Sequence, residues 1–253
     1  MTNQEKLKNI WKLSYDCNKY VADCDTKCLK KNDEFDLQLS YFYRTHVLPL
    51  PFMGKVNEPN VLILALNPSY DPINDEKDTF RVRNYNKKNS IDYIDNLFEF
   101  DLINNNDERN INIIGEYTYS WWSKVFDNAK PKTNSEIGIF NLCGYHSTSY
   151  KTIPCKCLEK GKYLQSQIDT CKIIYDIICN PKTELVIIVW GQKEWKKYFK
   201  SILKIQDINL NKLNKVVVLN DKNNFLNKSI YKYYNNLNPN DSKKELLKKF
   251  FEL

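Results

Sequence analysis

The sequence predicts an α/β fold, a three-layer α/β/α sandwich whose helices cover both faces of a mainly parallel, four-stranded sheet. Three observations predict it. Continuous apolar runs of strand length recur along the chain. Segments with helical periodicity separate these runs. Hydrophobic residues make up 42% and aromatic residues 13% of the 253 residues, which is enough for a substantial core.

Each predicted strand is apolar on both faces, as a buried parallel strand is. The four runs cover residues 61–66, 137–142, 185–190 and 216–219. Because ligands bind at the carboxyl ends of parallel strands, the residues that follow each run are the candidate functional positions.

The segments between the strands carry helix and loop signals. Apolar residues at helical spacing predict helices over 3–20, 90–100, 119–128, 165–179, 192–203 and 242–251. Polar or Pro-rich composition predicts loops over 49–59, 69–89 and 104–112. The chain has no internal repeat and no long linker. We therefore expect one domain over 1–253, with a core over 59–230 and a helical and loop extension over 1–58 packed on it.

The composition excludes several protein classes. No apolar run approaches the roughly 18 residues that span a bilayer, and no apolar stretch follows a basic start. We therefore expect a cytoplasmic protein, a monomer that makes no membrane contact. The net charge of +7 suits a polyanionic partner, although biased coding composition also explains the lysine excess.

The eight cysteines leave two interpretations open. Without a secretion signal, reduced and mostly buried thiols are the simpler one. A metal or iron–sulfur site is the other, with Cys17, Cys24 and Cys28 on one helical face and Cys155 and Cys157 as further ligands. Because no C-x-x-C pair is present and the chain has only two histidines, we predict no metal and no cofactor.

Polar and aromatic residues recur at the ends of three predicted strands and on one predicted helix in a characteristic order. The four segments are Ala65-Leu66-Asn67-Pro68-Ser69, Tyr119 to Phe126, Ile139-Phe140-Asn141-Leu142 and Val186 to Trp195. In this order they resemble the uracil-DNA glycosylase superfamily, and in motif style its mismatch-specific uracil/thymine branch. The resemblance covers roughly residues 61–227. It implies a uracil-DNA glycosylase-like fold and a hydrolase that acts on N-glycosyl bonds.

The resemblance implies a monofunctional DNA glycosylase that removes a uracil, mismatched or modified base, in repair or in defence against phage DNA. The base is flipped out of the duplex before its bond to deoxyribose is hydrolysed. No lysine stands where a Schiff-base lyase would need one, so we expect an abasic product without strand nicking. An unrelated Rossmann-like enzyme is disfavoured because no G-x-G-x-x-G follows a strand.

The chain departs from the family pattern in its first and last motifs. Ala65 and Ser69 replace the two glycines of the first motif, and the late His-Pro-Ser or Asn-Pro-Ser motif is absent. These departures favour an alternative from another class: a catalytically weak or inactive binding module that senses a nucleotide or modified DNA.

Three residues carry the predicted catalytic roles. By resemblance, Asn67 holds the attacking water, and Asp71 is a possible substitute base. His146 takes the electrostatic role of the missing late histidine and donates to the oxyanion that forms on the departing base. Asn67 and His146 each have a purely structural alternative. An Asn-Pro pair often starts a turn, and a loop histidine often only makes hydrogen bonds to its neighbours.

The predicted base pocket consists of Pro68, Ser69, Tyr70, Asn141 and Tyr145. Tyr70 would stack on the base, or else pack as an ordinary tyrosine. Asn141 presents a donor and an acceptor to a pyrimidine edge, or else caps the end of its strand.

The predicted partner is DNA, and six residues are the candidate contacts. They are Ser147, Lys193, Lys196, Lys197, Lys222 and Asn223. The competing interpretation is a solvated helix face for the first three lysines and an ordinary surface loop over 220–227.

Overall fold

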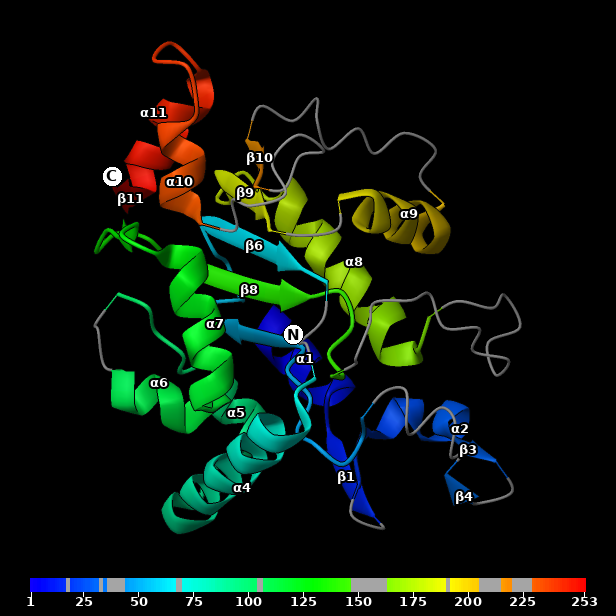
Figure 1. Cartoon of the computed structure of the whole chain (residues 1–253). Helices are drawn as coiled ribbons and strands as arrows, with labels where there is room; N and C mark the ends of the chain where they lie inside the picture. Colours follow the sequence, from blue (N-terminus) through cyan, green and yellow to red (C-terminus); the bar gives the residue numbers. More distant parts are fainter. Residues whose placement is uncertain are drawn as a thin grey trace.

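A five-stranded sheet forms the centre of the protein (Figure 1). The structure is a computed structural model that describes residues 1–16, 19–31, 34–35, 44–66, 70–103, 107–146, 163–189, 192–204, 215–219 and 229–253. The sheet has the order β10-β9-β6-β8-β5. Its strands are β5 (Phe52–Gly54), β6 (Val61–Ala65), β8 (Ile137–Asn141), β9 (Leu185–Ile188) and β10 (Val216–Val218).

The four predicted strands all run parallel to one another, as β6 pairs with β8 and β9, and β9 with β10. The prediction of four strands is nevertheless wrong, because β5 adds an antiparallel edge strand beside β8. The prolines around it indicated a loop, but an edge strand tolerates prolines, and Phe52 and Met53 are fully buried. The sheet therefore begins within the segment that we assigned to the extension.

The strand order creates a switch point at the carboxyl end of the sheet. From β6 the chain passes to β8 on one side of β6, and later returns to β9 on its other side. In parallel sheets, connections that leave in opposite directions open a crevice at this end, and ligands bind there.

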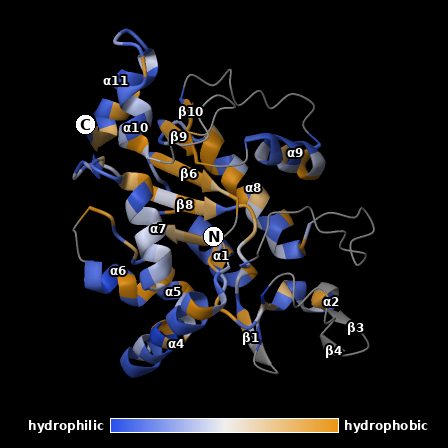
Figure 2. Ribbon diagram, viewed as in Figure 1, coloured by the Kyte–Doolittle hydropathy of each residue, from blue (hydrophilic) through white to orange (hydrophobic). Residues whose placement is uncertain are grey.

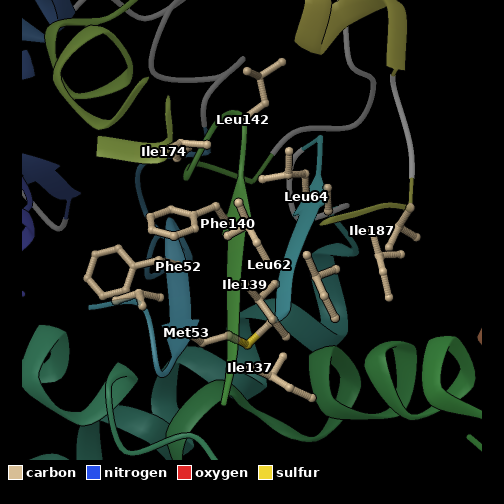
Figure 3. Packing of buried hydrophobic residues seen from close by; sticks show 14 of the residues in the cluster. Phe52, Met53, Leu62, Leu64, Ile137, Ile139, Phe140, Leu142, Ile174 and Ile187 are labelled. Carbon is tan, nitrogen blue, oxygen red and sulfur yellow. The ribbon is translucent and has the colours of Figure 1, made fainter. Parts of the chain in front are cut away.

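Apolar residues of the strands fill the core. Every residue of β6, β8 and β9 is buried, and Figure 3 shows the side chains of β5, β8 and β6 packed against one another. The Phe52 ring lies 4.8 Å from that of Phe98 and 6.2 Å from that of Phe140, between ring centroids. In Figure 2 the strands are apolar, whereas the helices carry polar residues on their outer sides. Leu7 and Trp11 belong to the same core, so the N-terminal helix packs on the sheet domain.

Helices flank the sheet and give an α/β architecture compatible with a three-layer sandwich. They are α1 (Asn3–Ile10), η1 (Asp23–Asp25), α2 (Thr26–Leu29), α4 (Pro72–Asn89), α5 (Tyr93–Leu97), α6 (Asp107–Ile114), α7 (Glu116–Phe126), α8 (Gln165–Cys179), α9 (Gln192–Leu203), α10 (Ile230–Asn235) and α11 (Ser242–Phe250). The predicted bounds of α8 and α9 are confirmed, because strong apolar periodicity marks both helices. Helix α1 contacts α8, while α4, α6 and α7 contact one another.

The predicted helix over 3–20 is wrong beyond Ile10. There the chain turns into an antiparallel hairpin of β1 (Leu13–Asp16) and β2 (Lys19–Ala22). Trp11 ends α1, and its indole Nε1 donates to Thr170 of α8 over 3.1 Å, which fixes the chain at this point. Short strand-prone runs then pair locally instead of extending the helix.

Two predicted loops are helices. Residues 72–89 form α4, which Asp71 caps and Pro72 opens, and residues 107–114 form α6. The buried residues of α4 are Asp75, Asp78, Val82 and Asn86. Because only one of these is apolar, hydrophobic periodicity could not reveal the helix. The predicted helix over 90–100 is shorter, since Ser90 ends α4 and Asp92 caps α5.

Two short ladders complete the described structure: β3 (Lys30–Lys31) with β4 (Glu34–Phe35), and β7 (Lys130–Pro131) with β11 (Phe251–Glu252). None of the described helices is long and apolar enough to cross a membrane. Among the described residues, no three His, Cys, Asp or Glu side chains gather as a metal site requires. Cys24 is a free thiol that donates to the Ile10 carbonyl, whereas Cys17, Cys155 and Cys157 lie outside the described residues.

Candidate functional site

The segments that follow β6 and β8 are joined by backbone hydrogen bonds at the carboxyl end of the sheet. The Cys143 N–H donates to the Leu66 carbonyl over 2.8 Å, and the Leu50 N–H donates to the Gly144 carbonyl over 2.7 Å. A side chain at Gly144 would place a Cβ 2.5 Å from the Trp11 ring. Only glycine therefore allows the backbone at position 144 to lie this close to Trp11. The chain around 44–50 and the chain around 142–146 are therefore held together beside the end of β6.

Asp71 begins α4 as its N-cap. Its Oδ1 accepts the N–H groups of Ile73 over 3.1 Å and Asn74 over 2.9 Å. This satisfies two helix-end donors that would otherwise lack partners. Oδ1 of Asp71 therefore serves the helix, and a role of this carboxylate as a substitute base stays a prediction.

One turn further along α4, Asp75 faces His146. The Asp75 Oδ2 accepts the Asp71 N–H over 2.6 Å and lies 3.4 Å from His146 Nδ1. Only 1% of the Asp75 side chain and 7% of the His146 side chain are exposed. The second oxygen of Asp75, Oδ1, is buried with no hydrogen-bond partner among the described residues. A buried carboxylate beside an imidazole orients the ring and balances its charge when both nitrogens are protonated.

Tyr70 and the second histidine lie next to this pair. The Tyr70 hydroxyl is 2.9 Å from His46 Nε2, and the two rings meet edge to face with centroids 5.5 Å apart. The Glu76 carboxylate lies 3.6 Å from the same nitrogen. The Arg44 guanidinium lies over the Tyr70 ring, 4.5 Å from its centroid.

We call these six residues the histidine cluster: Arg44, His46, Tyr70, Asp75, Glu76 and His146. Both histidines of the chain are members. The cluster combines three loops or helix ends that are distant in the sequence but meet at the carboxyl end of β6 and β8.

Electrostatics sets the proton positions in the cluster. Burial lowers the pKa of His46 from its ordinary value of 6.5; the negative charge of Glu76 opposes this, and the positive charge of Arg44 adds to it. Burial raises the pKa of Tyr70, and the negative charge of Glu76 raises it further. At neutral pH, His46 is therefore neutral and the Tyr70 phenol protonated, and the His46 tautomer sets which of the two groups donates in their hydrogen bond. Such an array can supply hydrogen-bond donors to an anion that develops nearby.

Two predicted pocket residues are engaged by the fold. The amide Nδ2 of Asn141 donates to the Leu50 carbonyl over 2.7 Å, which is what a strand-end cap does. The Tyr145 hydroxyl donates to Asp25 over 2.8 Å and accepts from the Ala22 N–H over 3.0 Å, and its side chain is buried. We correct the assignment of Tyr145, because its polar end lies in this buried network.

The remaining predicted residues fall into two groups. Lys193 and Lys197 are exposed on α9 and Lys196 is half-buried, whereas Trp195 and Phe199 bury the opposite face. Phosphate contact by these lysines stays a prediction. The others lie outside the described residues: Asn67, Pro68, Ser69, Ser147, Lys222 and Asn223.

The sequence did not identify four members of the histidine cluster, namely Arg44, His46, Asp75 and Glu76. A usable signal was the Asp71-Pro72 start of a helix, which places Asp75 and Glu76 in its first turns. His46 had only its scarcity as a signal, since the chain contains one other histidine.

We compared the chain with protein families, curated proteins and solved structures. No family model, no curated protein and no solved structure matches this chain.

Proposed function

We propose that this protein is a monofunctional DNA glycosylase that hydrolyses the bond between deoxyribose and a uracil, mismatched or modified base flipped out of DNA. The observation that carries the proposal is the buried pair of His146 and Asp75, 3.4 Å apart at the carboxyl end of the parallel sheet. A buried carboxylate beside a buried imidazole at such an edge is an arrangement that favours a catalytic site over a purely structural one.

The reaction needs charge stabilisation on two sides. As the C–N bond breaks, its electron pair goes to the base, and the sugar carbon becomes positive before water adds and loses a proton. His146, oriented by Asp75, donates to the departing base and stabilises its negative charge. The family resemblance assigns the positioning of the water to Asn67, which lies outside the described residues.

Tyr70 is the candidate for stacking on the flipped base. One face of its ring lies against Arg44, so a base would stack on the opposite face. Hydrogen bonding to His46 fixes the orientation of the Tyr70 ring, which lowers the entropy lost when a base binds.

A binding module that no longer cleaves is the second candidate. The observation that favours it is that Asp71, Asn141 and Tyr145 all hold the fold with their polar groups. Fewer polar groups of the predicted site then stay available to recognise a base and to hydrolyse its bond to the sugar.

The test is a panel of labelled duplexes, each with one uracil, one thymine opposite guanine, one hypoxanthine or one 5-hydroxymethyluracil. Each is incubated with excess protein and then split into samples with and without alkali. We expect breaks only after alkali and at one base type, with His146→Gln as the impaired control. Duplex binding without any alkali-labile product would refute the glycosylase and support the binding module.

A further inference from the structure

The outer half of α4 and the N-terminal hairpin line an open pocket of about 360 Å³. Six of its lining residues carry the argument: Leu13, Tyr20, Leu48, Arg83, Lys87 and Tyr93. The pocket lies on the same helix as Asp75 but nearer its far end, where α4 extends away from the sheet (Figure 1). Its volume lies at the lower end of the range of small-ligand sites.

Apolar and aromatic residues form one part of the pocket lining, and Asn84 and Asn86 of α4 are polar members of it. Leu48 and Tyr20 pack together in a small apolar cluster, with Leu13 and Tyr93 against it. The Tyr93 hydroxyl donates to the Pro49 carbonyl over 2.7 Å, which fixes the ring in place. A planar aromatic ligand can therefore enter without leaving a buried hydroxyl of Tyr93 unsatisfied.

The rim of the pocket is cationic. Arg83 and Lys87 are exposed and one helical turn apart on α4. The Arg83 guanidinium lies 5.6 Å from the centroid of the Tyr20 ring. Asp92 is the acidic residue of the rim, and its Oδ1 is engaged by the Ile94 N–H over 2.8 Å as the cap of α5. Apolar aromatic walls with two cations at the mouth suit a base with its phosphate.

Helix geometry connects this pocket to the histidine cluster. Arg83 follows Glu76 by seven positions on α4, which is roughly 10 Å at the helical rise of 1.5 Å per residue. That length corresponds to about three nucleotide steps of one B-form strand. A strand that placed one nucleotide at the cluster would therefore reach Arg83 with its neighbours.

We propose that this pocket is a subsite for a nucleotide about three positions from the flipped one on the same DNA strand. The base lies against Tyr20 and Tyr93, and Arg83 and Lys87 bind the phosphates. The proposal rests on the proposed function, because it assumes that the bound strand passes the histidine cluster.

The test measures binding of a fluorescent duplex at several salt concentrations, with the double variant Arg83→Gln/Lys87→Gln. Loss of two phosphate contacts should reduce the slope of log K against log salt by about 1.8. The matched control is Arg81→Gln/Lys88→Gln, which removes the same charge from the same helix at residues that do not line the pocket. The control should keep a slope close to that of wild type.

Truncated duplexes locate the contact. In one truncated duplex, the target strand is cut short next to the target nucleotide, so that no nucleotide reaches the pocket. The double variant and wild type should then bind this duplex equally. Equal slopes for the double variant and its control, or a difference that persists with both truncations, would overturn the subsite. Excision by wild type in that case would leave the proposed function intact. A reduced slope without excision of any base would support the subsite and refute the glycosylase.

Discussion

Asp75 and Asp78 lie one turn apart on α4, are both buried, and do different things. Asp78 accepts the N–H groups of Glu116 and Tyr117, each over 2.9 Å, and so caps α7 from outside that helix. Asp75 faces His146 and leaves its Oδ1 without a partner among the described residues. A carboxylate whose oxygens are saturated by backbone donors stabilises the fold, whereas one that faces an imidazole can support chemistry.

The surroundings of Asp78 show how strictly it is built into the fold. Gly115 precedes α7 with φ +87°, and a Cβ there would lie 2.2 Å from Asp78 Cγ. Burial raises the pKa of Asp78, the three N–H donors of α7 oppose this, and the nearby charge of Asp75 adds to it. Asp78 therefore replaces the N-cap side chain that Gly115 cannot supply.

The largest effect should follow from Asp75→Asn. We expect the excision rate to fall about 10²- to 10³-fold, because His146 loses the carboxylate that orients its ring. The amide keeps an acceptor for the Asp71 N–H, so the protein should still fold. Single-turnover excision measures the rate, and circular dichroism checks the fold; wild-type rates in a folded variant would remove Asp75 from the mechanism.

Asp78→Ala should have the opposite profile. Loss of the α7 cap should lower the free energy of unfolding by about 1–2 kcal/mol. Because the Asp78 carboxylate binds the backbone at the start of α7, excision by the folded variant should stay close to wild type. Urea unfolding with the same excision assay tests both halves, and a loss of excision matching that of Asp75→Asn would erase the distinction between the two carboxylates.

A smaller effect concerns His46 and pH. Its pKa is lowered in the folded state from the ordinary 6.5, so the unfolded chain takes up a proton first as pH falls. Its contribution to stability is therefore present above pH 6.5 and is lost as pH falls through the folded pKa. Urea unfolding between pH 7.5 and 5.5 should show a weaker pH dependence for His46→Gln than for wild type; identical curves would contradict this assignment.

The strands were predictable, whereas the helix that carries the site was not. The run 61–66 is apolar throughout and 137–142 is apolar except for Asn141, so their burial could be read directly from the sequence. Helix α4 could not be recognised from hydrophobic periodicity, because its buried face carries Asp75, Asp78 and Asn86. The polar groups that make this face useful are the same groups that remove its apolar periodicity.

The candidate site was predictable in part for a related reason. Tyr70 and His146 follow predicted strands. They were therefore predicted as site residues, because ligands bind at the carboxyl ends of parallel strands. His46 and Asp75 join them only through tertiary packing of the 44–50 segment and the first turn of α4. Tyr145 also follows a strand, but its hydroxyl turns to Asp25, a direction that strand position alone does not determine.

The most direct test of the central claim is a double-mutant cycle on the His146–Asp75 pair. Single-turnover excision is measured for wild type, Asp75→Asn, His146→Gln and the variant with both substitutions. If the two residues act as one unit, each single substitution causes a large loss and the double variant loses no more than the worse single one. Losses that multiply, or a wild-type rate in either single variant, would contradict the account.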